Sequence, residues 1–142
     1  MHGDADYLFD PTKSITFQSR SDIIRLALLN RYGGVWADST MLCLEPLDSW
    51  LPKDNNMQSG LWMYHGNGGR FVPGTGPASW FIISLPGSQP GGYMIQRWKA
   101  ACDAYWHTRT ETGQLSHWMD VLFTDLFNSV SARLYARDAL ET

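Results

Sequence analysis

Apolar and polar positions divide the chain into a mixed front part and a helical rear part. A serine cap at Ser19 or Ser21 precedes an apolar run, and two glycines follow Tyr32, so a helix is predicted between them. From residue 93 onward the apolar spacing is again helical. Short apolar runs predict strands at 35–37, 41–44, 60–65 and 79–84, and the rear helices are predicted at 93–108, 115–130 and 131–140. The pattern predicts an α/β fold with a helical C-terminal half.

The remaining segments carry turn signals. The first twenty residues read as irregular and polar, and glycine and proline mark turns or loops at 46–56, 66–77 and 85–92. The glycine-rich stretch 66–77 completes no phosphate-binding motif, so a loop or substrate lid is the better interpretation. We find no repeat and no linker, and 142 residues suit a single domain over 1–142.

Charge and hydropathy exclude several function classes. The net charge is -3, which gives no broad cationic surface for nucleic acid. The longest apolar runs, such as "LALL" and "WFII", fall far short of the ~20 residues of a membrane span. The acidic start "MHGDADYLFD" is unlike a secretory signal, so a cytoplasmic location is expected.

Cysteines, histidines and tryptophans give weak functional signals. Cys43 and Cys102 are far apart and are expected to be reduced core residues. The four histidines show no ligand spacing. Aromatic residues make up 13% of the chain, and those on the rear helices, Trp98, Trp106 and Trp118, are expected in the core.

The first predicted helix holds an acid and a base among apolar residues. In "DIIRLALL", the apolar positions spread around nearly the whole circumference at ~100° per residue, so the helix is expected to be buried. Asp22 and Arg25 are three apart and lie on one face. Two interpretations stay open: a salt bridge that stabilises the first turn, or a pair directed into a polar cavity.

A single carboxylate follows the strand after this helix. In open α/β sheets, ligands bind beyond the carboxyl ends of strands, where Asp38 is placed. With Ser39 and Thr40 it offers hard oxygen ligands suited to Mg²⁺ or Mn²⁺ held mainly by substrate phosphates. A turn-forming aspartate is an equally good interpretation.

The stretch "SDIIRLALLNRYGGVWADST" resembles the central motif of the capsular polysaccharide synthesis glycosyltransferases, relatives of DXD-type sugar transferases and of the large clostridial glucosylating toxins. That motif joins Asp-x-x-Arg, a leucine-rich helix, a Tyr-Gly-Gly turn, a strand, and D-x-D or D-x-T. The segments "SWFIISLPGSQPGGYMIQRWKAACDAYW" and "HWMDVLFTDLFN" are similar to later blocks of the family. The resemblance spans about residues 14 to 130 and implies a GT-A-like, Rossmann-like core.

The resemblance also implies roles for individual residues. Asp22 and Arg25 would bind hydroxyls of the donor sugar, and Ser21 would lie near the nucleotide. Asp38 would contact a Mg²⁺ or Mn²⁺ ion and the nucleotide, and Thr40 stands where many relatives carry a second aspartate. Residues matching the later blocks are Trp80 and Asp125. The implied reaction transfers a sugar, with retention, from a nucleotide sugar such as a UDP-sugar to a saccharide acceptor.

One departure from the family concerns the start of the chain. Family members carry further strands before the Asp-x-x-Arg helix, where this chain has about twenty residues. The chain is then a fragment of a longer enzyme, or a second copy completes the sheet in a homo-oligomer, or the protein is a non-catalytic binding or assembly protein.

Overall fold

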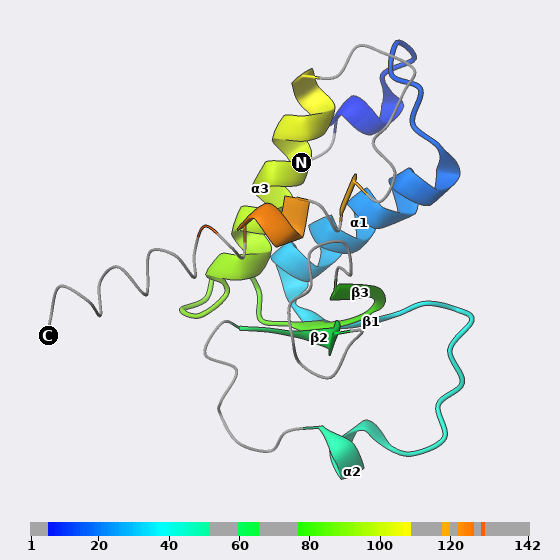
Figure 1. Ribbon diagram of the computed structural model, residues 1–142, viewed down its shortest axis with the longest axis vertical. Coiled ribbons are helices and arrows are strands. Elements are labelled where there is room, and N and C mark those ends of the chain that lie inside the picture. Colours follow the sequence, from blue (N-terminus) through cyan, green and yellow to red (C-terminus); the bar gives the residue numbers. More distant parts are fainter. Residues whose placement is uncertain are drawn as a thin grey trace, which may run out of the picture.

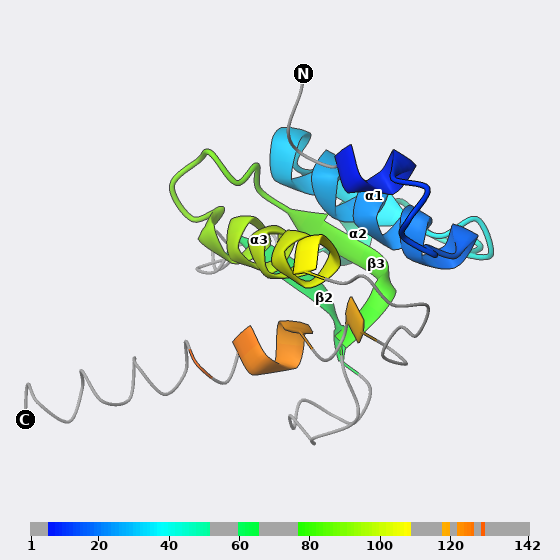
Figure 2. The same cartoon turned by 90° about the horizontal axis from the view of Figure 1, so that it is seen from above.

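The computed structural model describes residues 6–51, 60–65, 77–108, 118–119, 122–126 and 129. In chain order its elements are η1 (Asp6–Phe9), α1 (Phe17–Tyr32), β1 (Gly34–Ala37), α2 (Leu47–Trp50), β2 (Leu61–His65), β3 (Pro77–Ser84) and α3 (Tyr93–Thr108). The long helices α1 and α3 lie on one side of the sheet, and α2 lies on the other (Figures 1 and 2). The predicted α/β class is confirmed.

The sheet is small and antiparallel. Its order is β1-β3-β2, so β3 is central and the other two described strands lie at the edges. β1 pairs with β3 from Gly34 opposite Ser84 to Ala37 opposite Phe81. A Rossmann-like core is built on parallel strands, and the described strands include no parallel pair. The GT-A-like core therefore stays a prediction.

The pairing of β2 with β3 is irregular between Met63 and Tyr64. Met63 lies opposite Ile82, but the next residue, Tyr64, lies opposite Ala78. The three residues of β3 between these positions have no partner in β2. Two of them contact other segments instead, since Phe81 pairs with Ala37 of β1 and the Trp80 carbonyl accepts a hydrogen bond from the Asp38 N–H.

Capping residues define the ends of α1. The Thr16 hydroxyl accepts a hydrogen bond from the Ser19 backbone N–H at 3.2 Å, so the helix begins before the predicted Ser19 or Ser21. At the other end the Gly33 N–H donates to the Leu29 carbonyl. Gly33 has φ +66°, and a Cβ there would lie 2.6 Å from Pro86 Cδ. The predicted glycine stop is confirmed.

The core lies between α1, α3 and one face of the sheet. Its largest fully buried side chains are Trp98, Leu26, Ile82 and Ile95. The expectation that Trp98, Trp106 and Trp118 belong to the core is confirmed, since each is at most 3% exposed. The expectation that α1 is buried all round is wrong, because Ile24 and Leu28 are 45% and 44% exposed. The sheet covers one side of α1 and α3 covers another, which leaves this third stripe outside.

The N-terminal segment is more ordered than the sequence indicated. Residues 6–9 form the 3₁₀ helix η1, whose Tyr7 and Leu8 are buried. The Tyr7 hydroxyl donates to Asp103 on α3 at 2.6 Å, and Lys13 donates to the Trp106 and His107 carbonyls. These contacts fix the segment against α3.

Most of the predicted strands are confirmed, and one of them is wrong. The strands at 35–37, 60–65 and 79–84 and the helix at 93–108 are confirmed within one or two residues. The strand at 41–44 is wrong, because this segment is irregular and the chain continues into the unpredicted α2. Cys102 is buried as expected, but Cys43 is exposed, and both thiols are free.

Some predictions fall where no structure is described. The loop at 66–76 and the helix at 131–140 lie outside the described residues. Within 115–130, the described positions 118–119, 122–126 and 129 are helical. Among the helices of the described ranges, none has the length and apolar character that a membrane span requires.

Candidate functional site

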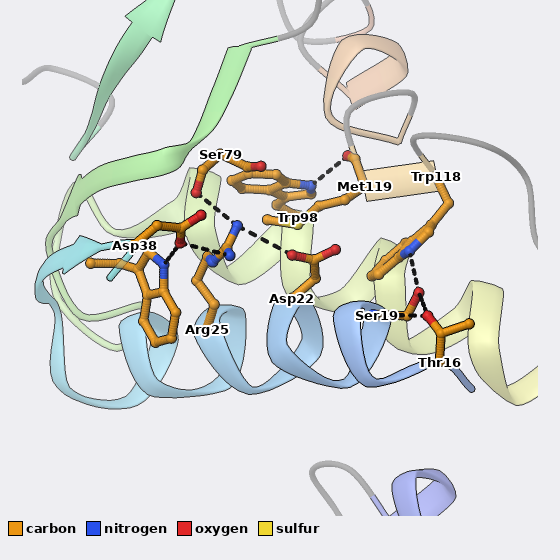
Figure 3. Close-up of polar contacts among 10 residues, drawn as sticks. Thr16, Ser19, Asp22, Arg25, Asp38, Ser79, Trp98, Trp118 and Met119 are labelled. Atoms are coloured by element: carbon orange, nitrogen blue, oxygen red, sulfur yellow. Dashed lines mark hydrogen bonds and ion pairs between the residues drawn. The ribbon is translucent and has the colours of Figure 1, made fainter. Parts of the chain in front are cut away.

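Three charged side chains meet where α1 passes the end of β1. Asp22 and Arg25 come from α1, and Asp38 follows β1 directly (Figure 3). Arg25 Nη1 lies 3.2 Å from Asp22 Oδ1, and Arg25 Nη2 lies 3.0 Å from Asp38 Oδ1. The guanidinium thus joins two carboxylates that are sixteen positions apart in the sequence. The pair forms a salt bridge and it borders a hollow, but it does not stabilise the first turn, because α1 begins at Phe17 and its first turn holds no acidic residue.

Arg25 is enclosed by the protein. The residue is 5% exposed, its Nη1 also donates to the Ser79 carbonyl at 2.7 Å, and its guanidinium carbon lies 4.9 Å from the centre of the Trp36 ring. Ser79 belongs to the part of β3 left unpaired by the irregularity with β2, which is why its carbonyl can accept this bond. Both terminal nitrogens are occupied, while Nε is buried with no hydrogen-bond partner among the described residues. Its contacts favour a role in holding the carboxylates.

Asp38 presents one occupied and one open oxygen. Oδ1 accepts hydrogen bonds from Arg25 Nη2 and, at 2.7 Å, from Trp36 Nε1. Oδ2 accepts none from the described residues, and the side chain is 33% exposed. The backbone of Asp38 does form a turn, because its carbonyl accepts a hydrogen bond from the Met41 N–H, while its own N–H donates to the Trp80 carbonyl of β3. The carboxylate itself takes no part in that turn, so Asp38 is more than a turn former.

The three charged residues border a hollow of about 700 Å³, a size typical of small-molecule sites. The residues lining it are Gln18, Ser19, Ser21, Asp22, Arg25, Trp36, Ala37, Asp38, Ser39, Thr40, Ser79, Trp118 and Met119. Five of the residues predicted from the sequence are therefore brought together: Ser21, Asp22, Arg25, Asp38 and Thr40. Two are not among the lining residues. Trp80 lies on β3 with its ring stacked on Tyr64 at 5.0 Å, and Asp125 is exposed in the helical residues 122–126.

Sequence reasoning missed the wall that closes this hollow opposite α1. Trp118 and Met119 form it, and both are buried. Trp118 Nε1 donates to the Ser19 hydroxyl at 3.2 Å, and Trp98 Nε1 donates to the Met119 carbonyl at 3.1 Å (Figure 3). Nothing near Trp118 in the sequence indicates this role, because the contact joins positions 99 apart.

The charge of the hollow favours some ligands over others. Of the described residues that line it, Asp22, Arg25 and Asp38 are charged, and together they carry a formal charge of -1. A diphosphate would be repelled here unless a divalent cation came with it. Among the described residues, no group of three or more His, Cys, Asp or Glu side chains is arranged to hold a metal. Asp38 and Thr40, which both line the hollow, carry oxygen atoms of the kind that Mg²⁺ and Mn²⁺ take as ligands.

A family model described as capsular polysaccharide synthesis protein matches residues 8–140. No curated protein and no solved structure gives a significant match to the chain.

Proposed function

Because this chain belongs to the family of capsular polysaccharide synthesis proteins, we propose that it acts in that synthesis as a sugar transferase with a nucleotide-sugar donor. In such a reaction the bond from the anomeric carbon to the diphosphate oxygen breaks. A bond forms to an acceptor hydroxyl oxygen, whose proton is released, and the nucleoside diphosphate leaves. The saccharide acceptor, the UDP-sugar donor and the GT-A-like core are parts of this proposal, as is retention at the anomeric carbon.

One observation carries the proposal. An acid and a base on α1 and an acid after β1 converge on one hollow, and Ser21 and Thr40 line the same hollow. If Asp22 and Arg25 were only a surface salt bridge, no contact with a third, distant carboxylate would be needed. Arg25 is instead buried between them, a placement that costs desolvation energy and is common at binding sites.

Some of these residues would contact the donor, and others would hold those residues in position. Asp22 and Ser21 would accept hydrogen bonds from hydroxyls of the donor, which fixes the sugar relative to the acceptor. Arg25 would act as a positioning residue, because its terminal nitrogens already bond to Asp22, Asp38 and the Ser79 carbonyl. Trp36 supports the same arrangement through its bond to Asp38 Oδ1.

A Mg²⁺ or Mn²⁺ ion would be held by Asp38 and Thr40 together with the donor's phosphates. When bound, it would neutralise charge that builds up on the departing diphosphate. The described residues would supply only part of the ligand set, so cation and nucleotide would bind together.

Binding of UDP-sugars tests the proposal. The full chain is heated with UDP-glucose, UDP-galactose or UDP-N-acetylglucosamine, each with and without MnCl₂. A donor at 100 times its Kd stabilises by about 2.7 kcal/mol, or roughly 5–10 °C in Tm, and the rise should require Mn²⁺. Asp38→Asn should abolish the rise. Asp48→Asn, the same change at an exposed position of α2 outside the hollow, should keep it.

The outcomes separate the two functions that the sequence left open. A Mn²⁺-dependent rise that Asp38→Asn removes supports a nucleotide-sugar transferase. No rise with any of the three donors contradicts the proposal and favours a binding or assembly protein. A rise that survives in Asp38→Asn would show that the nucleotide binds elsewhere.

A further inference from the structure

A second hollow, of about 510 Å³, lies on the other face of the sheet. It is bounded by the sheet, by the irregular segment after Asp38 and by α2, which Figures 1 and 2 show on the side away from α1 and α3. The residues lining it are Val35, Ala37, Asp38, Met41, Leu42, Cys43, Leu44, Glu45, Leu47, Trp50, Tyr64 and Phe81. The first hollow is mostly polar, whereas ten of these twelve side chains are apolar or aromatic.

An aromatic cluster forms one wall of this second hollow. The Trp50 ring lies 5.6 Å from Phe81 and 6.2 Å from Tyr64, measured between centres. Behind them, Trp80 stacks on Tyr64, and Trp62 lies edge-on to both Tyr64 and Phe81. Rings held by this many neighbours make a firm apolar surface.

The opposite wall leaves large aliphatic side chains in water. Leu42 is 80% exposed and Leu44 is 84% exposed, in the segment that was wrongly predicted to be a strand. Covering these leucine side chains would remove apolar surface from water, which favours an apolar ligand laid along this segment. Among the described residues that line it there is no lysine, arginine or histidine to attract a phosphate or nucleotide.

The two hollows meet at one residue pair. Ala37 and Asp38 line both of them. Asp38 Oδ1 is bonded to Arg25 and Trp36 on the side of the first hollow, and Oδ2 is open. A molecule lying in the second hollow therefore has one end at Asp38, next to the space assigned to the donor sugar.

From this juxtaposition we propose that the second hollow binds the apolar aglycone of an amphiphilic acceptor, a saccharide joined to a hydrocarbon chain. The hydrocarbon lies against Leu42, Leu44 and Trp50, and the saccharide end lies at Asp38. The placement of the saccharide end at Asp38 rests on the proposed transferase function. The preference of the second hollow for an apolar ligand does not, and it can be measured separately.

Two glycosides that differ only in the aglycone test it. Methyl β-D-glucoside and octyl β-D-glucoside are titrated into the full chain, with the octyl compound kept below its micelle concentration, and tryptophan fluorescence reports binding. The octyl compound has seven more methylene groups, and burying about half of them should tighten binding at least 30-fold. Octyl glucoside should also slow alkylation of Cys43, which lines the hollow, whereas methyl glucoside should not.

A pair of leucine variants gives the control. Leu44→Ser should reduce the preference for the octyl compound at least fivefold, and its 84% exposure means that folding is not at risk. Leu28→Ser makes the same change on the exposed stripe of α1, outside both hollows, and should leave the preference unchanged. Equal binding of the two glycosides, or an equal loss in both variants, would overturn the inference.

The UDP-sugar titration keeps this inference separate from the proposed function. Donor binding without an octyl preference refutes the aglycone site and leaves the transferase standing. An octyl preference without donor binding supports the apolar site and contradicts the transferase.

Discussion

Replacing Arg25 by methionine should destabilise the fold far more than the loss of an ordinary surface charge. The Arg25 side chain is 6% exposed and is bonded to Asp22, Asp38 and the Ser79 carbonyl. Methionine fills most of the space but offers no donor. Two carboxylates would then lose their ion-pair partner, and the Ser79 carbonyl would lose a hydrogen bond.

The size of the effect follows from these contacts. A hydrogen bond to a charged group contributes about 1.5–3 kcal/mol, and removing one partner of a fully buried ion pair costs about 3–5 kcal/mol. The Asp38 side chain is 33% exposed and keeps its bond from Trp36, so water can compensate part of the loss. We expect Arg25→Met to lower the free energy of unfolding by about 2–4 kcal/mol.

Urea unfolding at pH 7, followed by the fluorescence of the seven tryptophans, measures this quantity. Arg31→Met is the matched control, because Arg31 is exposed on the same helix and contacts only the Tyr32 ring among the described contacts, at 5.3 Å. The control should cost at most about 1 kcal/mol. If the two variants lose equal stability, Arg25 does not hold the site together. Adding Asp38→Asn to Arg25→Met should cost less than the sum of the single changes, because the two residues share one interaction.

Three further predictions concern other parts of the fold. Iodoacetamide should label Cys43 in the native protein and Cys102 only after unfolding, which peptide mass mapping would show. Cys102 is 1% exposed, and its pKa is raised, mainly by burial and also by the nearby Asp103 charge. In calorimetry, Gly33→Ala should lower Tm by several degrees more than Gly34→Ala. Both glycines have a positive φ, but only at Gly33 would an added Cβ lie less than 3 Å from Pro86 and the Ser84 carbonyl. Burial, and after it the hydrogen bond to Asp103, raises the pKa of Tyr7 above its ordinary value of 10.0. As the pH rises, the unfolded chain therefore releases this proton before the folded chain does, and the stability of the fold decreases above about pH 10. The wild type should lose stability between pH 9 and pH 11 more steeply than Tyr7→Phe does, and parallel unfolding curves for the two proteins would contradict this.

Local signals in the sequence determined most of the secondary structure. Gly33 ends α1 because its φ is positive, and the apolar spacing of 93–108 fixes α3. Such features depend on residues within one turn of each other, so they can be read directly. The start of α1 was misplaced because Thr16 competed with two later serines as the cap. Segment 41–44 has strand-like residues, but no strand of the described ranges pairs with it.

For the candidate site, the sequence by itself indicated which residues are candidates for binding, while the tertiary structure decided how they are placed relative to one another. Spacing and family resemblance singled out Asp22, Arg25 and Asp38. Only the packing of α1 against β1 and β3 buried Arg25 between the two carboxylates. The Ser79 carbonyl, the wall at Trp118 and the second hollow depend on contacts between distant segments. No local pattern encodes them, because the free energy that forms them comes from burying whole faces of helix and sheet against each other.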